Sequence, residues 1–212
     1  MSIRPALSVR PSHLFLIVLA AFSVSFVGNV GTAAAVPAPN QTVLTLDPVI
    51  VGVLKTAKVK VVPVGAATIG SAGLYFPVIN SNVNDLFVGT TKHQGGFELR
   101  IEKLRFGFRN IQVKTKAGSP ATGTVSAEPI VLGYGIGFQL PLSNIKIDSV
   151  QLRSPGVIAK YSLRLDKNIA KIINQALKIK VLVPGQKWAT LETRIARDAP
   201  MPVVPEETPF PV

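Results

Sequence analysis

Cysteine is absent from this 212-residue chain, and its absence excludes several kinds of chemistry. A chain without cysteine forms no disulfide, holds no metal through thiolates and has no thiol nucleophile. Histidine is nearly absent too: only His13 and His93 occur, which rules out His/Cys zinc sets and multi-histidine metal sites. GxSxG, P-loop and HExxH motifs are also missing. We therefore expect a protein that is not an enzyme and has no metal site.

The chain has one long apolar run, near the N-terminus, and no other follows it. Arg4 and Arg10 precede the apolar stretch 14–27, and the alanines at 33–35 offer a small-residue cleavage site. This order is typical of a secretory signal peptide, which we place at residues 1–35. An uncleaved N-terminal anchor is the alternative. We expect a secreted or cell-surface protein that has no transmembrane segment once the signal is removed.

Acidic residues are few: eleven stand against 23 lysines and arginines, and the formal net charge is +12. Six basic residues crowd one stretch that we expect to form a hairpin: Arg100, Lys103, Arg105, Arg109, Lys114 and Lys116. On an outward face they predict contact with an anionic envelope polymer or lipid surface. The alternative is a solvated face that maintains solubility. Nucleic acid is not expected, because export argues against it and the aromatic residues alternate like core residues.

Residues 36–198 are expected to form one β-rich domain, since the chain after the signal is long enough for a single domain with a full core. Residues 199–212 differ in composition, with five prolines and the acids Glu206 and Glu207. Proline at this density blocks both helices and sheet ladders. We expect this segment to be a disordered tail.

Apolar and polar residues alternate with period two from Leu74 to Leu165, and this pattern predicts strands. The stretch 134–142 is one such run and predicts a continuous strand. The parity of another run changes after Arg109. Because a one-residue slip turns every later side chain to the other face, we place a β-bulge near Arg109-Asn110.

Two segments have the same order of features: LTLDPVIVGVLKTAKVKVVPVG from Leu44 and LRLDKNIAKIINQALKIKVLVPG from Leu163. Each predicts a strand, a short helix and a second strand that ends near proline and glycine. Asp47 and Asp166 fall at the N-cap, where a carboxylate accepts from free backbone amides. The sequence therefore predicts a mainly β (α+β) fold. We expect an antiparallel β-sandwich or flattened barrel of about ten strands, with two short helices from the repeated β-α-β unit.

His93 is followed by Gln94-Gly95-Gly96, a sequence that favours a tight turn. Three hypotheses stay open for this histidine. It can hydrogen-bond the turn backbone in a structural role. It can bind haem or another planar molecule together with Tyr75 or Tyr161. It can belong to a Ser-His-Asp triad, for which Asp85 is a candidate acid.

Four stretches resemble the HtaA-type domain, the haem-transport-associated module of secreted and surface proteins in actinobacteria: LTLDPVIVGVL, GLYFPVI, VGTTKHQGGFEL and RNIQVKT. The resemblance covers roughly residues 41–197 and includes an HxGG hairpin. It implies a haem-binding domain with an axial tyrosine on the first helix and the HxG histidine close to it. His93 matches that histidine. The stretch Asp47–Thr56 contains no tyrosine, and Lys55 stands at about its place.

These observations together predict an exported, non-enzymatic binding or structural protein without a cofactor. Its basic surface is expected to contact anionic envelope material. The alternative is a haem-binding protein of the HtaA type that uses His93 and a strand tyrosine.

Overall fold

The computed structural model of the protein describes residues 40–118, 121–153 and 156–196, all of which belong to one structural unit. The predicted signal peptide and the predicted proline-rich tail lie outside these residues. In this part of the chain, neither helix has the length and apolar character needed to span a bilayer.

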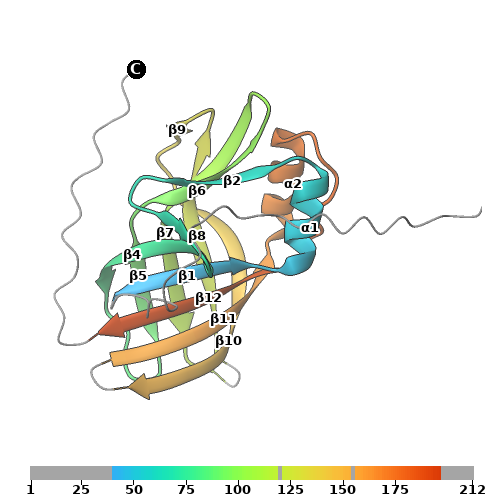
Figure 1. Ribbon diagram of the computed structural model, residues 1–212. Helices are drawn as coiled ribbons and strands as arrows, with labels where there is room; N and C mark the ends of the chain where they lie inside the picture. The colour runs from blue at the N-terminus through green and yellow to red at the C-terminus, as the bar shows by residue number, and fades with distance from the viewer. Residues whose placement is uncertain (1–39, 119–120, 154–155, 197–212) are drawn as a thin grey trace, which may run out of the picture. The chain divides into compact units, whose positions relative to one another are not determined.

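Twelve strands and two helices occur in the described residues (Figure 1). The strands are β1 (Gln41–Leu46), β2 (Lys60–Val64), β3 (Thr68–Gly70), β4 (Gly73–Ser81), β5 (Gly89–His93), β6 (Gly96–Ile101), β7 (Leu104–Lys116), β8 (Thr122–Val131), β9 (Tyr134–Gly135), β10 (Leu140–Arg153), β11 (Gly156–Leu165) and β12 (Lys187–Ala196). The helices are α1 (Pro48–Thr56) and α2 (Lys167–Ala176).

Eight of these strands close an antiparallel barrel in the order β7-β5-β4-β1-β12-β11-β10-β8, and the pairing of β8 with β7 completes it. Four more strands extend the sheet: β6 and β2 beyond the first half of β7, β9 beside β8, and β3 beside β4. The prediction of a mainly β fold with two helices is confirmed, and the barrel, not the sandwich, is the architecture that forms. The strands exceed the predicted ten because β3 and β9, of three and two residues, are too short to show an alternating pattern.

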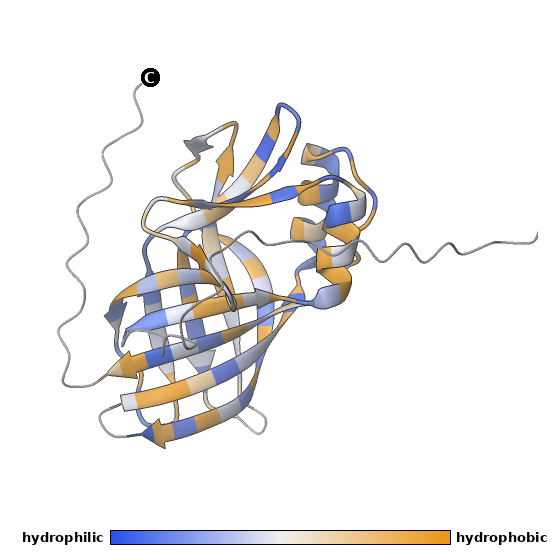
Figure 2. Cartoon of the chain, in the orientation of Figure 1, coloured by the Kyte–Doolittle hydropathy of each residue, from blue (hydrophilic) through white to orange (hydrophobic). Residues whose placement is uncertain are grey.

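Apolar side chains fill the barrel because apolar and polar residues alternate along its strands. Figure 2 shows hydrophobic and hydrophilic residues following one another along the strands. In β4, for example, Leu74, Phe76 and Val78 are buried in the core, while Tyr75 between them is only half-buried. Closure of the barrel leaves its strands no free edge. The buried apolar side chains of the strands form one core.

The predicted bulge in β7 is confirmed. The register between β7 and β8 shifts between Arg109 and Gln112, and Asn110 has a φ of 52°. The first half of β7 pairs with β6, and the second half pairs with β5. The bulge is thus the point at which β7, followed along the chain, passes from the extension into the barrel wall.

Both helices begin as the sequence predicts. The Asp47 carboxylate accepts from the Val49 amide at 3.0 Å, and the Asp166 carboxylate accepts from the Asn168 amide at 2.8 Å. The helices lie at the same end of the barrel (Figure 1) and contribute Ile50 and Ile173 to one apolar cluster. The second copy departs from the predicted β-α-β order, because no strand follows α2 until β12.

The two helices also end alike, with a lysine in the left-handed region: φ is 57° at Lys58 and 55° at Lys178. A side chain there strains the backbone by about 1–2 kcal/mol, and glycine removes that strain. We expect Lys58→Gly to raise the free energy of unfolding by about 0.5–1 kcal/mol, after allowance for the greater freedom of glycine in the unfolded chain. Urea unfolding measures this, with Lys58→Ala as the control that removes the charge and keeps the strain. Equal stability of the two variants would contradict the prediction.

Candidate functional site

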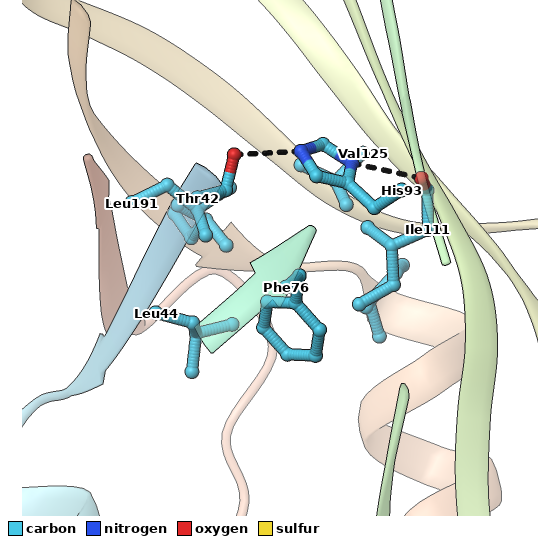
Figure 3. Close-up of a pocket in the computed structure, with 9 residues that line it drawn as sticks. Thr42, Leu44, Phe76, His93, Ile111, Val125 and Leu191 are labelled. Atoms are coloured by element: carbon cyan, nitrogen blue, oxygen red, sulfur yellow. Dashed lines mark hydrogen bonds between the residues drawn. The ribbon is translucent and has the colours of Figure 1, made fainter. Parts of the chain in front are cut away.

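The His93 ring lies inside the barrel, between β1 and β7 (Figure 3). Its Nδ1 is 2.9 Å from the Ile111 carbonyl oxygen, and its Nε2 is 2.6 Å from the Thr42 hydroxyl. A carbonyl oxygen only accepts, so Nδ1 carries the proton and the Thr42 hydroxyl donates to Nε2. Burial lowers the pKa of His93 to about 4, and the bond to Ile111 offsets part of this effect. The imidazole is therefore neutral at neutral pH.

A chain of hydroxyl groups continues from His93 over the neighbouring strands β1 and β12. The Thr42 and Thr193 hydroxyls are 2.8 Å apart, and Thr193 donates because the Thr42 proton is already used. The nearby Tyr161 hydroxyl is buried without a hydrogen-bond partner of good geometry among the described residues. Burial raises the pKa of this phenol well above its ordinary value, and Thr193 offsets only part of the rise. His93 and Tyr161 thus belong to one buried polar region.

The space beside these groups is small. A cavity of about 10 Å³ lies between His93, Thr42 and apolar side chains that include Leu44 and Phe76 (Figure 3). A second cavity, of about 30 Å³, lies beneath the two helices and has an entirely apolar lining. Sites for small molecules and cofactors measure roughly 300–1,000 Å³. Neither cavity holds a haem, so the inside of the barrel does not fit this group.

The ligand roles proposed for His93, Tyr75 and Tyr161 stay predictions, and the geometry does not favour them. The structure brings His93 and Tyr161 into the same interior. Tyr75 lies elsewhere, with its ring against Gly70, where a Cβ would come within 2.7 Å of the ring. Both nitrogens of His93 are engaged, so a ligand role would require one of these bonds to break.

A structural role for His93 fits better, although its partners differ from those we expected. The ring bonds strands β1 and β7, not the backbone of the turn after it. The turn itself is present, with Gly95 at a φ of 78°. The two ring nitrogens bond Thr42 and Ile111, so neither is bonded to a carboxylate as a triad would require. Among the described residues, no group of three or more His, Cys, Asp or Glu is placed to hold a metal ion.

The six basic residues of the predicted hairpin do not form one contact surface. Arg100 pairs with Glu98 at 2.7 Å, and Arg109 pairs with Glu128 at 2.9 Å. The other four are exposed and fall into two pairs: Lys103 with Arg105, and Lys114 with Lys116. Nine residues of strand β7 separate these pairs by roughly 30 Å. Their placement does not favour a single basic face, and their contact with an anionic surface stays a prediction.

A feature that the sequence analysis missed is the apolar loop, residues 131–138, which contains β9. Five of its side chains are exposed by 41 to 61 %: Val131, Leu132, Tyr134, Ile136 and Phe138. The run 134–142 was expected to be one strand, but the strand stops at Gly135 and β10 starts at Leu140. Gly133 and Gly137 have φ values of 93° and 73°, and these conformations turn the chain. These two glycines are the feature of the sequence that could have predicted the loop.

Glu128 fixes the apolar loop to the sheet. Its carboxylate accepts from the Arg109 guanidinium at 2.9 and 3.0 Å, from the Asn110 side chain at 3.1 Å and from the Gly137 amide at 3.0 Å. The bonds from Arg109 are the main reason why the pKa of Glu128 is lowered. Gly135 crosses this ion pair so closely that a Cβ would collide with it. The loop therefore has a defined position.

No protein-family model and no curated protein matches this sequence. Among solved structures, the C-terminal domain of HtaA from Corynebacterium glutamicum is similar, with a TM-score of 0.53 and 11 % identity; the match covers 73 % of this chain and 94 % of that domain. This chain has an HtaA-type fold. The predicted resemblance is thereby confirmed at the level of the fold. The haem-binding protein HtaB from the same organism also matches, with a TM-score of 0.48 and 14 % identity, over 72 % of this chain and 90 % of HtaB.

These matches contradict our expectation of a protein without a cofactor, and that expectation is not retained. The HtaA-type fold of this chain is found among structures that include a haem-binding protein.

Proposed function

We propose that this protein binds haem, that the apolar loop is the binding site, and that Tyr134 is the iron ligand. Haem iron is held in proteins by histidine, tyrosine, methionine or cysteine. The described residues offer His93, Tyr75, Tyr134 and Tyr161. Of these four, Tyr134 alone is exposed, by 58 %. This exposed phenol on an apolar loop is the observation that supports the proposal.

The surroundings of Tyr134 suit a flat apolar molecule with acidic edges. Leu132, Ile136 and Phe138 are exposed beside it in the sequence and offer apolar contact area. The Leu132 amide donates to the Arg105 carbonyl oxygen at 3.3 Å, which joins the apolar loop to the hairpin between β6 and β7. The exposed Arg105 on that hairpin is a cation for a carboxylate. Bound haem would supply the iron that a tyrosine oxygen coordinates.

The hydrogen bonds that Glu128 accepts also support the proposal, because they lower the entropic cost of binding. Because the Gly137 amide is held in place, the loop loses little freedom when it binds a ligand. Export of the protein, which the predicted signal peptide at 1–35 supports, and the absence of catalysis belong to the proposal as well.

The test is a titration of residues 36–212 with haemin, followed by visible absorbance. We expect a saturable shift of the Soret band and at least a tenfold weaker affinity for Tyr134→Phe, since one oxygen ligand to iron is lost. Tyr75→Phe is the matched control and should bind as the original protein does. An unchanged affinity of Tyr134→Phe would refute the site, and no saturable shift in any variant would refute haem binding itself.

A further inference from the structure

A groove with a volume of about 530 Å³ lies along α2, between this helix and residues 178–184. Its volume falls within the range of about 300–1,000 Å³ that is usual for small-molecule sites. The apolar loop contributes no residue to it. The groove is therefore a second candidate site, independent of the proposed haem site.

Hydrogen bonds hold the groove open without a ligand. The side chain of Asn174 in α2 bonds both backbone groups of Leu182: it donates to the carbonyl oxygen at 2.8 Å and accepts from the amide at 3.1 Å. The Ile179 amide also donates to the Asn174 carbonyl oxygen at 2.8 Å. The segment that forms one wall of the groove is thus fixed to the helix, and the ligand need not order it.

The charge along the groove has one sign. Lys171, Lys178 and Lys180 line it and are exposed, and no acidic residue lines it. Within the described ranges, none of the three forms an ion pair. Three ammonium groups so placed repel one another, and a bound anion lowers this repulsion. Lysine ammonium groups are compact donors that suit phosphate oxygens.

Apolar groups lie beside the lysines. Ile179, Leu182 and Pro184 also line the groove, and the neighbouring Val183 is exposed by 56 %. A free phosphate ion bound to the lysines would make no contact with these apolar side chains. A ligand that joins a phosphate to an apolar body satisfies both parts of the groove.

We propose that this groove binds the headgroup of an anionic phospholipid at a bilayer surface. Lys171, Lys178 and Lys180 take the phosphate, and Ile179 and Pro184 contact the start of the acyl chains. In this proposal the protein contacts anionic envelope material through α2 and not through the β6–β7 hairpin. The interaction positions the protein on a membrane whether or not haem is bound.

The experiment compares two triple variants of residues 36–212 in sedimentation with vesicles of phosphatidylcholine, with or without phosphatidylglycerol. K171Q/K178Q/K180Q removes the lysines of the groove. K114Q/K116Q/K146Q removes the same charge from exposed lysines outside it. Each lysine near an anionic bilayer contributes about 1 kcal/mol, so we expect the groove variant to bind mixed vesicles about 100-fold more weakly. The control variant should change less than about threefold, because its lysines lie away from the groove.

Equal losses in the two variants would overturn the proposal, because the groove would then act only through net charge. Failure of the original protein to sediment with the mixed vesicles, while inorganic phosphate still binds to it and not to the groove variant, would show that the groove takes phosphate ions and not lipid. Haemin binding by the groove variant should remain unchanged. The two proposals therefore fail separately: a protein without haem affinity can still bind vesicles through this groove.

Discussion

Acidification from pH 7 to 4.5 is expected to reduce the free energy of unfolding by about 2.5 kcal/mol through His93 alone. The ordinary pKa of histidine is 6.5, and burial lowers that of His93 to about 4 in the folded protein. Between these two values the unfolded chain binds a proton that the folded protein does not. Stability is therefore complete above pH 6.5 and falls as the pH drops toward 4.

The reason for the low pKa is the packing around the ring. Protonation would place a charge among Leu44, Phe76 and Leu191 in a cavity too small for hydrating water beyond a single molecule. It would also require the Thr42 hydroxyl to turn from donor to acceptor, since Nε2 would then carry a proton. Glu128 and Glu192, whose pKa values are lowered, add their own losses only near and below pH 4.5. The range from pH 6.5 to 4.5 thus isolates His93.

Urea unfolding of residues 36–212 at pH 7, 5.5 and 4.5 measures this loss. His93→Gln is the matched control, because the amide supplies a donor and an acceptor and does not titrate. Its stability should be nearly constant over this range. Should this variant fail to fold, the imidazole proton resonances of the original protein give a direct answer, since His93 is the one histidine of residues 36–212. A titration midpoint near 6.5 would contradict the buried, neutral ring.

The parts of the fold that follow from local rules were predictable from the sequence. The N-caps at Asp47 and Asp166 depend on neighbouring amides, and the bulge at Asn110 depends on parity along one strand. Both signals lie within a few residues of the feature that they predict. The mainly β fold follows similarly, because alternation is a property of each strand by itself.

The site depended on contacts between distant residues, and here the sequence was less informative. His93 bonds Thr42, which is 51 residues away, and no local pattern indicates this partner. The basic residues of β7 lie close together in the sequence but apart in space, because an extended strand separates them by roughly 3.3 Å per residue. The run 134–142 alternates like a strand, yet Gly133, Gly137 and the bond from the Gly137 amide to Glu128 fold it into a loop. Tertiary contacts there override the local pattern.

Glu128→Ala is expected to lower the free energy of unfolding by about 3 kcal/mol, because it removes one partner of a largely buried ion pair. The Glu128 side chain is 10 % exposed and that of Arg109 is 21 % exposed. After the substitution, three donors lose their acceptor in Glu128. They are the Arg109 guanidinium, the side-chain amide of Asn110 and the backbone amide of Gly137. The loss of this largely buried acceptor by the three donors is the main part of the cost. Urea unfolding at pH 7 measures it.

The same substitution should also weaken haemin binding, because the Gly137 amide no longer holds the apolar loop in place. Glu192→Ala is the matched control. Glu192 accepts from Lys160 and Arg194 on strands β11 and β12, so its removal destabilises the barrel without freeing the loop. If stability alone governed haemin affinity, both variants would lose it in proportion to their free energies of unfolding. If the position of Tyr134 governs haemin affinity, only Glu128→Ala should weaken haemin binding. Adding Arg109→Met to Glu128→Ala should then weaken binding little further, because both substitutions break the same ion pair.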